Sequence, residues 1–343
     1  MTSTQGGTGG APLMPMGGSN TGVLPGSGGS GGAAAGSGGT GVAAGAGGGA
    51  TAGAAGMSAG GTGGAAGAGG AVAGTAGAAG AAGAPAGAEG DLRAGPSAGC
   101  NGQVNDPYGE DVEHSLLGDR LYWTRLPDAY DGTTPVPIVF YGPGCGIANN
   151  VEGAPLDGSI SADAMRVFLV STGGCFDTGG PESPEGEYFE TALAEIEAAY
   201  CTDLSKVFLA GYSSGGWLTN QLACSHGDLI RGIGTAAGGM PDPSAQCVGR
   251  VAAMMHAGTG DTANPIENID DGVDRGSGAA KERIRLANNC TDQTMPWGDI
   301  GYCQQYVGCD PGYEVVWCVE DTGHSNGGEV SQHGWWDFWS ALP

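Results

Sequence analysis

Positive charge is scarce in this sequence, and long apolar runs are absent. Lysine and arginine number 11 against 36 aspartate and glutamate residues, which gives a net charge of −25. Such a chain repels nucleic acids and other polyanions, so they are excluded as partners. No run of about 18 apolar residues occurs, which argues against a transmembrane segment. The opening residues also lack the basic start and apolar core of a signal peptide, so we expect the natural start to lie upstream.

Residues 1–96 lack almost everything from which a core is built. They are mostly Gly, Ala, Ser and Thr, and their first charged residue is Glu89. This composition buries too little apolar surface to offset the entropy lost when the backbone becomes ordered. We therefore expect residues 1–96 to be a disordered linker, or a tether to the cell envelope. Residues 97–343 have the usual size of one folded domain.

The ten cysteines all follow residue 96, and none of them forms a Cys-x-x-Cys pair. Zinc sites need closely spaced pairs, so disulfides are the better interpretation. Disulfides require an oxidising compartment, which predicts a secreted or cell-surface protein. The sequence does not fix the connectivity. The pairings we favour are Cys303 with Cys318, or Cys290 with Cys309, and Cys145 with Cys175.

Short apolar runs alternate with helical patterns after residue 97. Apolar runs without polar alternation are typical of buried parallel strands. The expected strands span residues 120–126, 136–141, 166–171, 206–210, 232–236, 252–256 and 313–319. The expected helices span residues 188–200, 214–224, 279–288 and 335–341. This order predicts an α/β fold, in which helices cover both faces of a mostly parallel central sheet.

A Gly-x-Ser-x-Gly pattern stands between the expected strand 206–210 and the expected helix 214–224, with Ser213 at its centre. This strand–turn–helix setting is typical of the nucleophile elbow of a serine hydrolase. The start of the helix favours the negative charge that develops when the serine attacks. The alternative is a glycine-rich turn with a passive serine.

A nucleophilic serine needs an acid and a histidine, which follow it in that order in this type of fold. Asp261 comes after an apolar strand and a glycine turn, at the sheet edge where open α/β sheets place ligands. The rival acids Asp270, Asp271 and Asp274 lie in a segment that lacks the spacing of a calcium loop. We interpret that segment as a solvated acidic loop.

Three histidines are candidates for the general base. His324 directly follows the last expected strand, where a loop can bring the imidazole over Ser213. His256 ends a buried strand, and His333 precedes the C-terminal helix, where a structural role is the simpler interpretation. His226 lies too close to the helix that follows Ser213. His324 is therefore the favoured base.

The oxyanion of the tetrahedral intermediate needs two backbone N–H donors. We expect one from Ser214, which follows the nucleophile, and one from Cys145, in the glycine-rich loop after the strand 136–141. His324 would take the proton of Ser213, an acyl-enzyme would form, and water would release the acid. This chemistry needs no metal or cofactor. It needs a neutral imidazole, so activity should fall at acidic pH.

These segments resemble the feruloyl esterases and polyhydroxybutyrate depolymerase-like esterases of carbohydrate esterase family one, within the α/β-hydrolase superfamily. The resemblance runs from about Cys100 to the C-terminus. Its segments are, in order, Gly144-Cys145-Gly146, Tyr200-Cys201-Thr202-Asp203, Gly211 to Gly216, Leu222-Ala223-Cys224, Gly258-Thr259-Gly260-Asp261, Ala287-Asn288-Asn289-Cys290 and Gly323-His324. It implies the α/β-hydrolase fold, with Ser213 as nucleophile, Asp261 as orienting acid and His324 as base.

Two departures from that family concern the mouth of the site. Pro143 stands where the family usually has histidine, and Ser325-Asn326 where it often has Trp-Pro. The resemblance implies a secreted serine carboxylester hydrolase that releases hydroxycinnamic acids from plant cell-wall polysaccharide or its oligosaccharides. Acetylated xylan and polyhydroxyalkanoate are alternative substrates, because both departures bear on the choice of acyl group.

A different class of function is a catalytically inactive domain that binds glycans or the cell surface. Trp335, Trp336 and Trp339 lie close together in the expected C-terminal helix. They form either an exposed binding platform or the buried face of that helix.

Overall fold

The computed structural model describes residues 93–343, apart from residues 117, 119, 147–155, 157–158, 180–182 and 245–246. The expected linker, residues 1–96, therefore lies outside the described residues except for its last four positions. Three of those four contact the folded domain, and Gly95 accepts a hydrogen bond from the backbone N–H of Leu204. Arg93 forms an ion pair with Glu197 at 2.7 Å, and Pro96 forms a β-bridge with Asp203.

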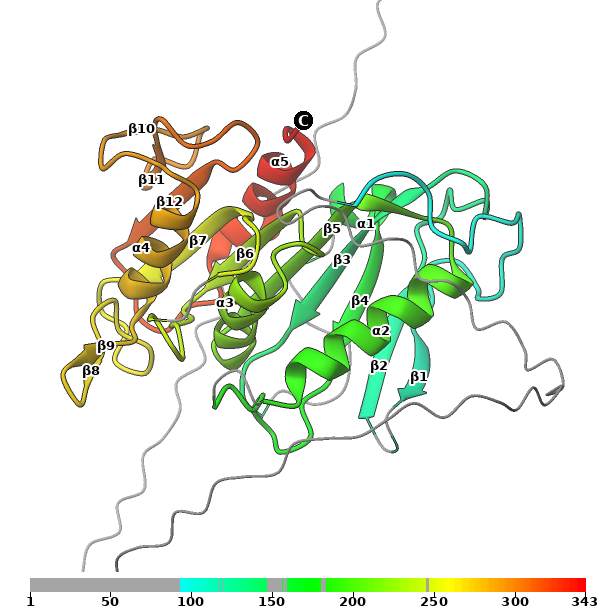
Figure 1. Cartoon of the computed structure of the whole chain (residues 1–343), viewed down its shortest axis with the longest axis horizontal. Coiled ribbons are helices and arrows are strands. Elements are labelled where there is room, and N and C mark those ends of the chain that lie inside the picture. The colour runs from blue at the N-terminus through cyan, green and yellow to red at the C-terminus, as the bar shows by residue number, and fades with distance from the viewer. Residues whose placement is uncertain are drawn as a thin grey trace, which may run out of the picture. The chain divides into compact units, whose positions relative to one another are not determined.

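One large sheet organises the described part of the chain (Figure 1). Its strands are β1 (Val112–Leu116), β2 (Arg120–Arg125), β3 (Val136–Gly142), β4 (Met165–Leu169), β5 (Thr202–Tyr212), β6 (Gly232–Ala236), β7 (Ala252–Gly258), β10 (Thr294–Pro296), β11 (Cys303–Tyr306) and β12 (Val315–Glu320). Their order across the sheet is β1-β2-β4-β3-β5-β6-β7-β12-β11-β10. The two short strands β8 (Ile269–Asp270) and β9 (Val273–Asp274) form a separate hairpin.

The centre of the sheet is parallel, as the apolar runs predicted. Strands β4, β3, β5, β6, β7 and β12 pair in parallel. The strands outside them, β1, β2, β11 and β10, are antiparallel to their neighbours. Parallel strands end at the same edge of the sheet, so the segments after β3, β5 and β7 meet there.

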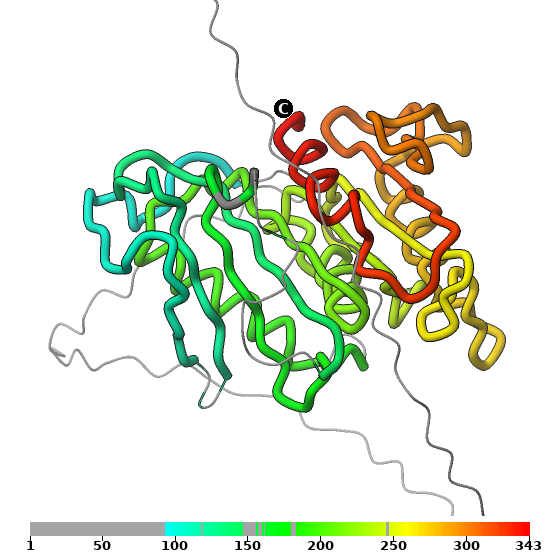
Figure 2. Tube along the Cα trace, turned by 180° about the vertical axis from the view of Figure 1, so that it is seen from behind, coloured from blue at the N-terminus to red at the C-terminus, as the bar shows by residue number. Residues whose placement is uncertain are grey.

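Helices cover both faces of the sheet, and each face has its own core. The helices are α1 (Ser159–Asp163), α2 (Glu185–Ala199), α3 (Ser214–Ser225), α4 (Ser277–Ala287), the π-helix η1 (Val330–Gly334) and α5 (Trp335–Ser340). Side chains of α2, α3 and α4 belong to one core cluster, and those of α1 and α5 to the other. Figure 2, which shows the back of the molecule, has α5 (red) on the face opposite to α2. Because successive residues of a strand point to opposite faces, β3 contributes Ile138 to the first core and Val139 to the second.

The tryptophans of α5 are core residues. Trp335, Trp336 and Trp339 are 0%, 8% and 2% exposed, and the ring of Trp339 stacks on Phe208 of β5. The idea of a tryptophan platform for glycans is therefore wrong. The apolar stripe of this helix packs against the sheet, as in most amphipathic helices.

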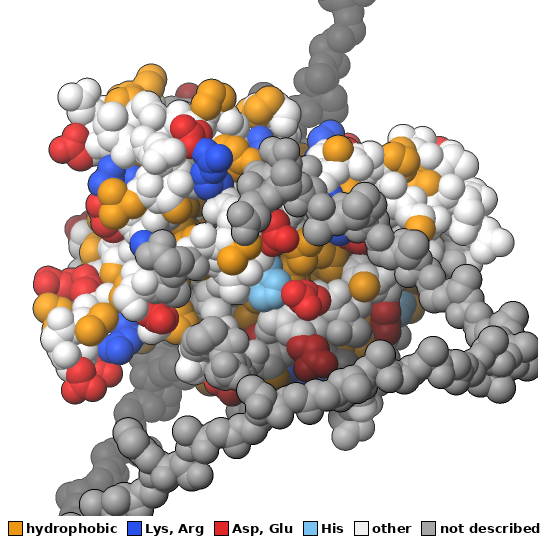
Figure 3. Space-filling model, in the orientation of Figure 1, with side chains coloured by type: hydrophobic (Ala, Val, Ile, Leu, Met, Phe, Trp, Pro, Cys, Tyr) orange, Lys and Arg blue, Asp and Glu red, His pale blue; other side chains and the backbone are white. Residues whose placement is uncertain are grey.

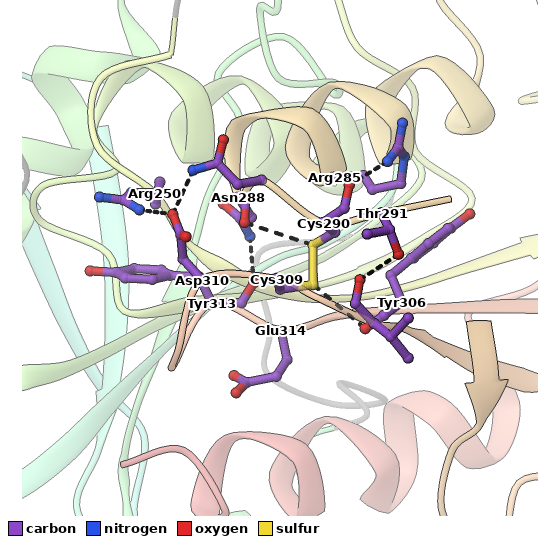
Figure 4. Close-up of a disulfide and its surroundings, with 12 residues drawn as sticks. Arg250, Arg285, Asn288, Cys290, Thr291, Tyr306, Cys309, Asp310, Tyr313 and Glu314 are labelled. Carbon is purple, nitrogen blue, oxygen red and sulfur yellow. Dashed lines mark hydrogen bonds and ion pairs between the residues drawn. A yellow bond between two sulfur atoms is a disulfide. The ribbon is translucent and has the colours of Figure 1, made fainter. Parts of the chain in front are cut away.

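All ten cysteines form disulfides. The pairs are Cys100–Cys201, Cys145–Cys175, Cys224–Cys247, Cys290–Cys309 and Cys303–Cys318. The three pairings favoured from the sequence are confirmed. Figure 4 shows Cys290–Cys309 beside Asn288, whose side-chain amide donates to the carbonyl oxygen of Tyr313. The same amide also donates to the carbonyl oxygen of Val251. Asp310, beside Cys309, forms an ion pair with Arg250.

Candidate active site

Ser213 lies on the sharp turn between β5 and α3. Its backbone has φ 55° and ψ −117°, a region that non-glycine residues rarely adopt and that often marks a functional site. The turn is tight enough to require glycine on both sides. A Cβ on Gly211 would lie 2.1 Å from the carbonyl oxygen of Gly215, and a Cβ on Gly215 would lie 1.8 Å from that of Gly142. The glycines of the motif therefore have a steric reason.

The structure brings Ser213, His324 and Asp261 together from three different loops. His324 Nε2 lies 3.1 Å from Ser213 Oγ, and His324 Nδ1 lies 2.8 Å from Asp261 Oδ2. Asp261 is buried, whereas the imidazole is partly exposed. These contacts have the hydrogen-bond order of a nucleophile, a base and an orienting acid.

Both carboxylate oxygens of Asp261 are in use. Oδ2 faces His324, while Oδ1 accepts hydrogen bonds from the backbone N–H groups of Ala263 at 2.9 Å and Asn264 at 2.8 Å. The same side chain thus orients the imidazole and fixes the loop that follows β7. The ring of Tyr212 lies beside the imidazole, with its centroid 5.0 Å from that of His324. Burial raises the pKa of Tyr212, so this phenol stays neutral near physiological pH.

The rival histidines make other contacts. His256 is buried in β7 and pairs with Glu320 at 3.1 Å. His333 pairs with Asp337 at 3.0 Å on the exposed side of the C-terminal helices. His226 pairs with Glu190 at 3.1 Å.

The rival acids lie on the hairpin formed by β8 and β9. Asp270 is 74% exposed and pairs with Arg275. Asp274 accepts the backbone N–H groups of Asn268 and Gly276. Asp271 occupies the turn between the strands, with a positive φ of 50°. These contacts fit the solvated acidic loop expected from the sequence.

The loop after β3 is fixed against the turn that carries Ser213. The backbone N–H of Gly215 donates to the carbonyl oxygen of Pro143 at 3.1 Å, and the N–H of Gly146 donates to the carbonyl oxygen of Gly174. The Cys145–Cys175 disulfide also joins the loop after β3 to the loop after β4. Cys145 and Ser214, the expected oxyanion donors, both line the cavity that contains Ser213.

This cavity has a volume of about 340 Å³. Its lining residues are Cys145, Cys175, Phe176, Thr178, Ser213, Ser214, Trp217 and Asn264. Since β4 and β3 lie on one side of β5 and β7 on the other, the cavity has two walls of different origin. The segments after β3 and β4 build one wall, and the loop after β7 builds the other.

Four residues of the cavity were not predicted: Phe176, Thr178, Trp217 and Asn264. Asn264 makes the most telling contacts, because its side chain lies between Trp217 and Ser213. The only signal in the sequence was its position three residues after Asp261, in the same loop. Phe176 and Thr178 follow Cys175, so that cysteine was the one marker of their segment.

Comparison with known proteins gives consistent relatives. No family model matches the chain. Feruloyl esterase D of Neurospora crassa is 24% identical over 253 residues, which cover 68% of this chain and 83% of that protein. A probable feruloyl esterase C of Aspergillus niger is 25% identical over 231 residues, which cover 62% of this chain and 78% of that protein. The chain is a carboxylic ester hydrolase similar to the feruloyl esterases.

The fold of this esterase is the α/β-hydrolase fold, as expected. The acetyl xylan esterase from Aspergillus awamori superposes on it with a TM-score of 0.50 at 14% identity, covering 67% of this chain and 98% of that one. In the described part of the chain, no cluster of three or more His, Cys, Asp or Glu side chains is arranged to hold a metal ion. None of the described helices is both long and apolar enough to span a membrane.

Proposed function

We propose that Ser213, His324 and Asp261 are the catalytic triad of this esterase. The observation that carries the proposal is the continuous hydrogen-bonded chain from Ser213 Oγ through His324 to Asp261, at the edge of the cavity. With Nδ1–H donated to Asp261, the imidazole presents a free Nε2 lone pair to the serine hydroxyl. Nε2 can then accept the hydroxyl proton as Oγ attacks an ester carbonyl.

The proposed reaction has two steps. Oγ bonds to the carbonyl carbon while its proton moves to His324, and the alcohol leaves with that proton. Water then loses a proton to His324 and attacks the acyl-enzyme, after which the C–Oγ bond breaks and the proton returns to Ser213. The backbone N–H groups of Ser214 and Cys145 are the proposed donors to the oxyanion. Ser214 begins α3, and the helix start adds favourable electrostatics.

The proposed substrates are esters of hydroxycinnamic acids on plant cell-wall polysaccharide or its oligosaccharides. Phe176 and Trp217 give the cavity aromatic walls, which suit a planar phenolic acyl group. The named relatives are feruloyl esterases, which supports the same acyl group. A second candidate is the acetyl group of xylan, because the acetyl xylan esterase of Aspergillus awamori shares the fold.

The proposed location is extracellular. Five disulfides in the described domain fit an oxidising compartment. Residues 1–96 are the proposed tether, with residues 97–343 as the esterase domain.

The test is hydrolysis of methyl ferulate, acetylated xylan and polyhydroxybutyrate side by side, by the wild type and by Ser213→Ala. We expect turnover of methyl ferulate that disappears in Ser213→Ala, while the unfolding temperature stays the same. Turnover of acetylated xylan alone would assign the second candidate. If oxidised wild type hydrolyses none of these and no simple aryl ester, the proposed function is wrong.

A further inference from the structure

Asn264 is held in one orientation by its neighbours. The indole Nε1–H of Trp217 donates to Asn264 Oδ1 at 3.0 Å, and Asp261 Oδ1 accepts the backbone N–H of Asn264. The Trp217 ring is itself closely packed, because a Cβ on Gly239 would lie 2.5 Å from it. Since an indole N–H only donates, it must face the amide oxygen, which turns the amide nitrogen the other way.

The amide nitrogen of Asn264 faces the reacting serine. Asn264 Nδ2 donates to Ser213 Oγ at 3.4 Å, while His324 Nε2 lies 3.1 Å from the same oxygen. A serine hydroxyl donates one hydrogen bond and accepts two. Ser213 can therefore donate to His324 and accept from Asn264 at the same time, with both contacts compatible with the proton transfer.

We propose that Asn264 is a fourth catalytic residue, which stabilises negative charge on Ser213 Oγ, and that Trp217 positions it. The proposal rests on the triad proposed above. As the proton passes from Oγ to His324, the oxygen gains charge, and a hydrogen bond from a neutral donor to an ionised acceptor becomes stronger. The same contact acts when the C–Oγ bond breaks in the second step and the oxygen leaves with the electron pair. Asn264 forms no covalent bond and exchanges no proton.

The two hydrogen-bonding groups of the Asn264 side chain can be separated by substitution. Asn264→Ala removes both. Asn264→Asp keeps the size and the acceptor for Trp217, but it has no N–H and places a carboxylate beside Oγ. Trp217→Phe keeps an aromatic ring against Gly239 and releases the amide. Asn105→Ala is the matched control. Asn105 is exposed, and its neighbour Asp106 contacts Tyr200, at the opposite end of β5 from Ser213.

The measurement is the pre-steady-state burst and the steady-state turnover of 4-nitrophenyl acetate, whose small acyl group leaves most of the cavity empty. For Asn264→Ala we expect kcat to fall about tenfold, with KM changed less than about twofold, which is the size expected for one hydrogen bond to a charged group. Asn264→Asp should lose more, and Trp217→Phe less. Asn105→Ala should match the wild type.

A double variant separates positioning from packing. If Trp217 acts only through Asn264, adding Trp217→Phe to Asn264→Ala should change kcat by less than about twofold. If the fall in kcat of the double variant equals the product of the falls in the two single variants, the positioning role of Trp217 is overturned. Unchanged kcat in the isosteric Asn264→Asp would overturn the catalytic role of Asn264, and a rise in KM alone would make it a substrate-binding residue instead. If Ser213→Ala is as active as the wild type, the proposed triad itself is wrong.

Discussion

Ser213 occupies a strained backbone position that the surrounding turn imposes. Its φ of 55° is stabilised by a hydrogen bond from its N–H to Ala236 and by the start of α3. Strain of this kind costs of the order of 1–3 kcal/mol and persists only where neighbouring contacts fix it. Gly215 allows the end of β3 at Gly142 to pack directly against the turn, because it has no Cβ to block that contact.

Gly215→Ala should therefore destabilise the protein more than an ordinary glycine substitution does. The added Cβ would meet the carbonyl oxygen of Gly142 at 1.8 Å, so backbone must move. We expect a loss of about 3 kcal/mol in the free energy of unfolding, measured by denaturant titration. Gly301→Ala is the control, because nothing lies within 4 Å of a Cβ there. Equal effects of the two substitutions would contradict this account of the turn.

His256 should make the folded state sensitive to acid. Burial lowers the pKa of His256 below its usual 6.5, although Glu320 and Asp261 act in the opposite direction. The unfolded chain then binds the proton more readily. Stability from this group is complete above the unfolded pKa and is lost as the pH falls through the lowered folded pKa.

The measurement is the unfolding temperature between about pH 7 and about pH 5, on either side of an ordinary histidine pKa. We expect it to fall with acidification, and to fall less in His256→Gln, whose amide can still donate to Glu320. The unfolding temperature of His256→Gln should still fall somewhat with acidification, because burial also lowers the pKa of His114. An identical slope in both proteins would exclude His256 as a cause.

The residues that sequence reasoning identified carry patterns of their own. Ser213 has the glycine motif, Asp261 a strand and a glycine turn before it, and His324 a position just after the last central strand. Asn264 has no such pattern. Its placement depends on where the β7 loop folds back and on an indole from α3, and neither is encoded by local spacing.

Glu185, at the start of α2, forms a buried ion pair with Arg120 of β2 and also contacts the cavity wall after β4. Arg120 Nη2 lies 2.6 Å from Glu185 Oε2, and Glu185 is 1% exposed. Glu185 Oε1 accepts the backbone N–H of Asp177 at 2.9 Å, in the segment that supplies Phe176 and Thr178. The start of α2 thus fixes one wall of the cavity.

Glu185→Gln should weaken both stability and substrate binding. It leaves the buried charge of Arg120 without its anionic partner, which we expect to cost about 3 kcal/mol. KM for methyl ferulate should rise more than kcat falls. Glu190→Gln is the control, because Glu190 is 57% exposed, and exposed pairs contribute about 1 kcal/mol or less. Chemical denaturation and initial rates measure the two effects, and a KM unchanged in Glu185→Gln would contradict the coupling.

The central strands of the sheet were predictable from the sequence, because a strand that is buried on both faces consists of a continuous run of apolar residues. β6 begins and ends where the sequence indicated, and β3 differs by one residue. The outer antiparallel strands β1, β10 and β11 were not predicted, because such strands need apolar side chains on only one face. β11, for example, contains Gln304 and Gln305. The disulfides Cys100–Cys201 and Cys224–Cys247 also went unpredicted, since the first closes 101 residues of chain.

Acidic side chains are exposed on the hairpin formed by β8 and β9. Figure 3 shows acidic side chains (red) over the hairpin of β8 and β9, where Asp270 is 74% exposed. That hairpin follows Asn264 in the chain, so it begins where one cavity wall ends. With 36 acidic residues against 11 basic ones, the long-range field of the domain repels anions.

An ester whose alcohol part bears a carboxylate should therefore be hydrolysed slowly at low ionic strength. We expect its kcat/KM to rise severalfold between about 0.02 M and about 0.5 M NaCl, because salt screens the repulsion. The matched neutral ester, in which an amide replaces the carboxylate, should change little. Parallel initial-rate measurements check this, and equal salt responses would show that the field does not reach the substrate.

The double use of Asp261 limits how this esterase can be redesigned. One carboxylate holds both the imidazole and the loop of Asn264, so grafting a new loop after β7 would misalign His324, the proposed base. The opposite wall is anchored by the Cys145–Cys175 disulfide and by Glu185. Libraries that seek new acyl groups should accordingly vary Phe176 and Thr178 and leave the β7 loop intact. In this chain, the choice of acyl group can change without disturbing the proposed proton transfer only at the wall that contains Phe176 and Thr178.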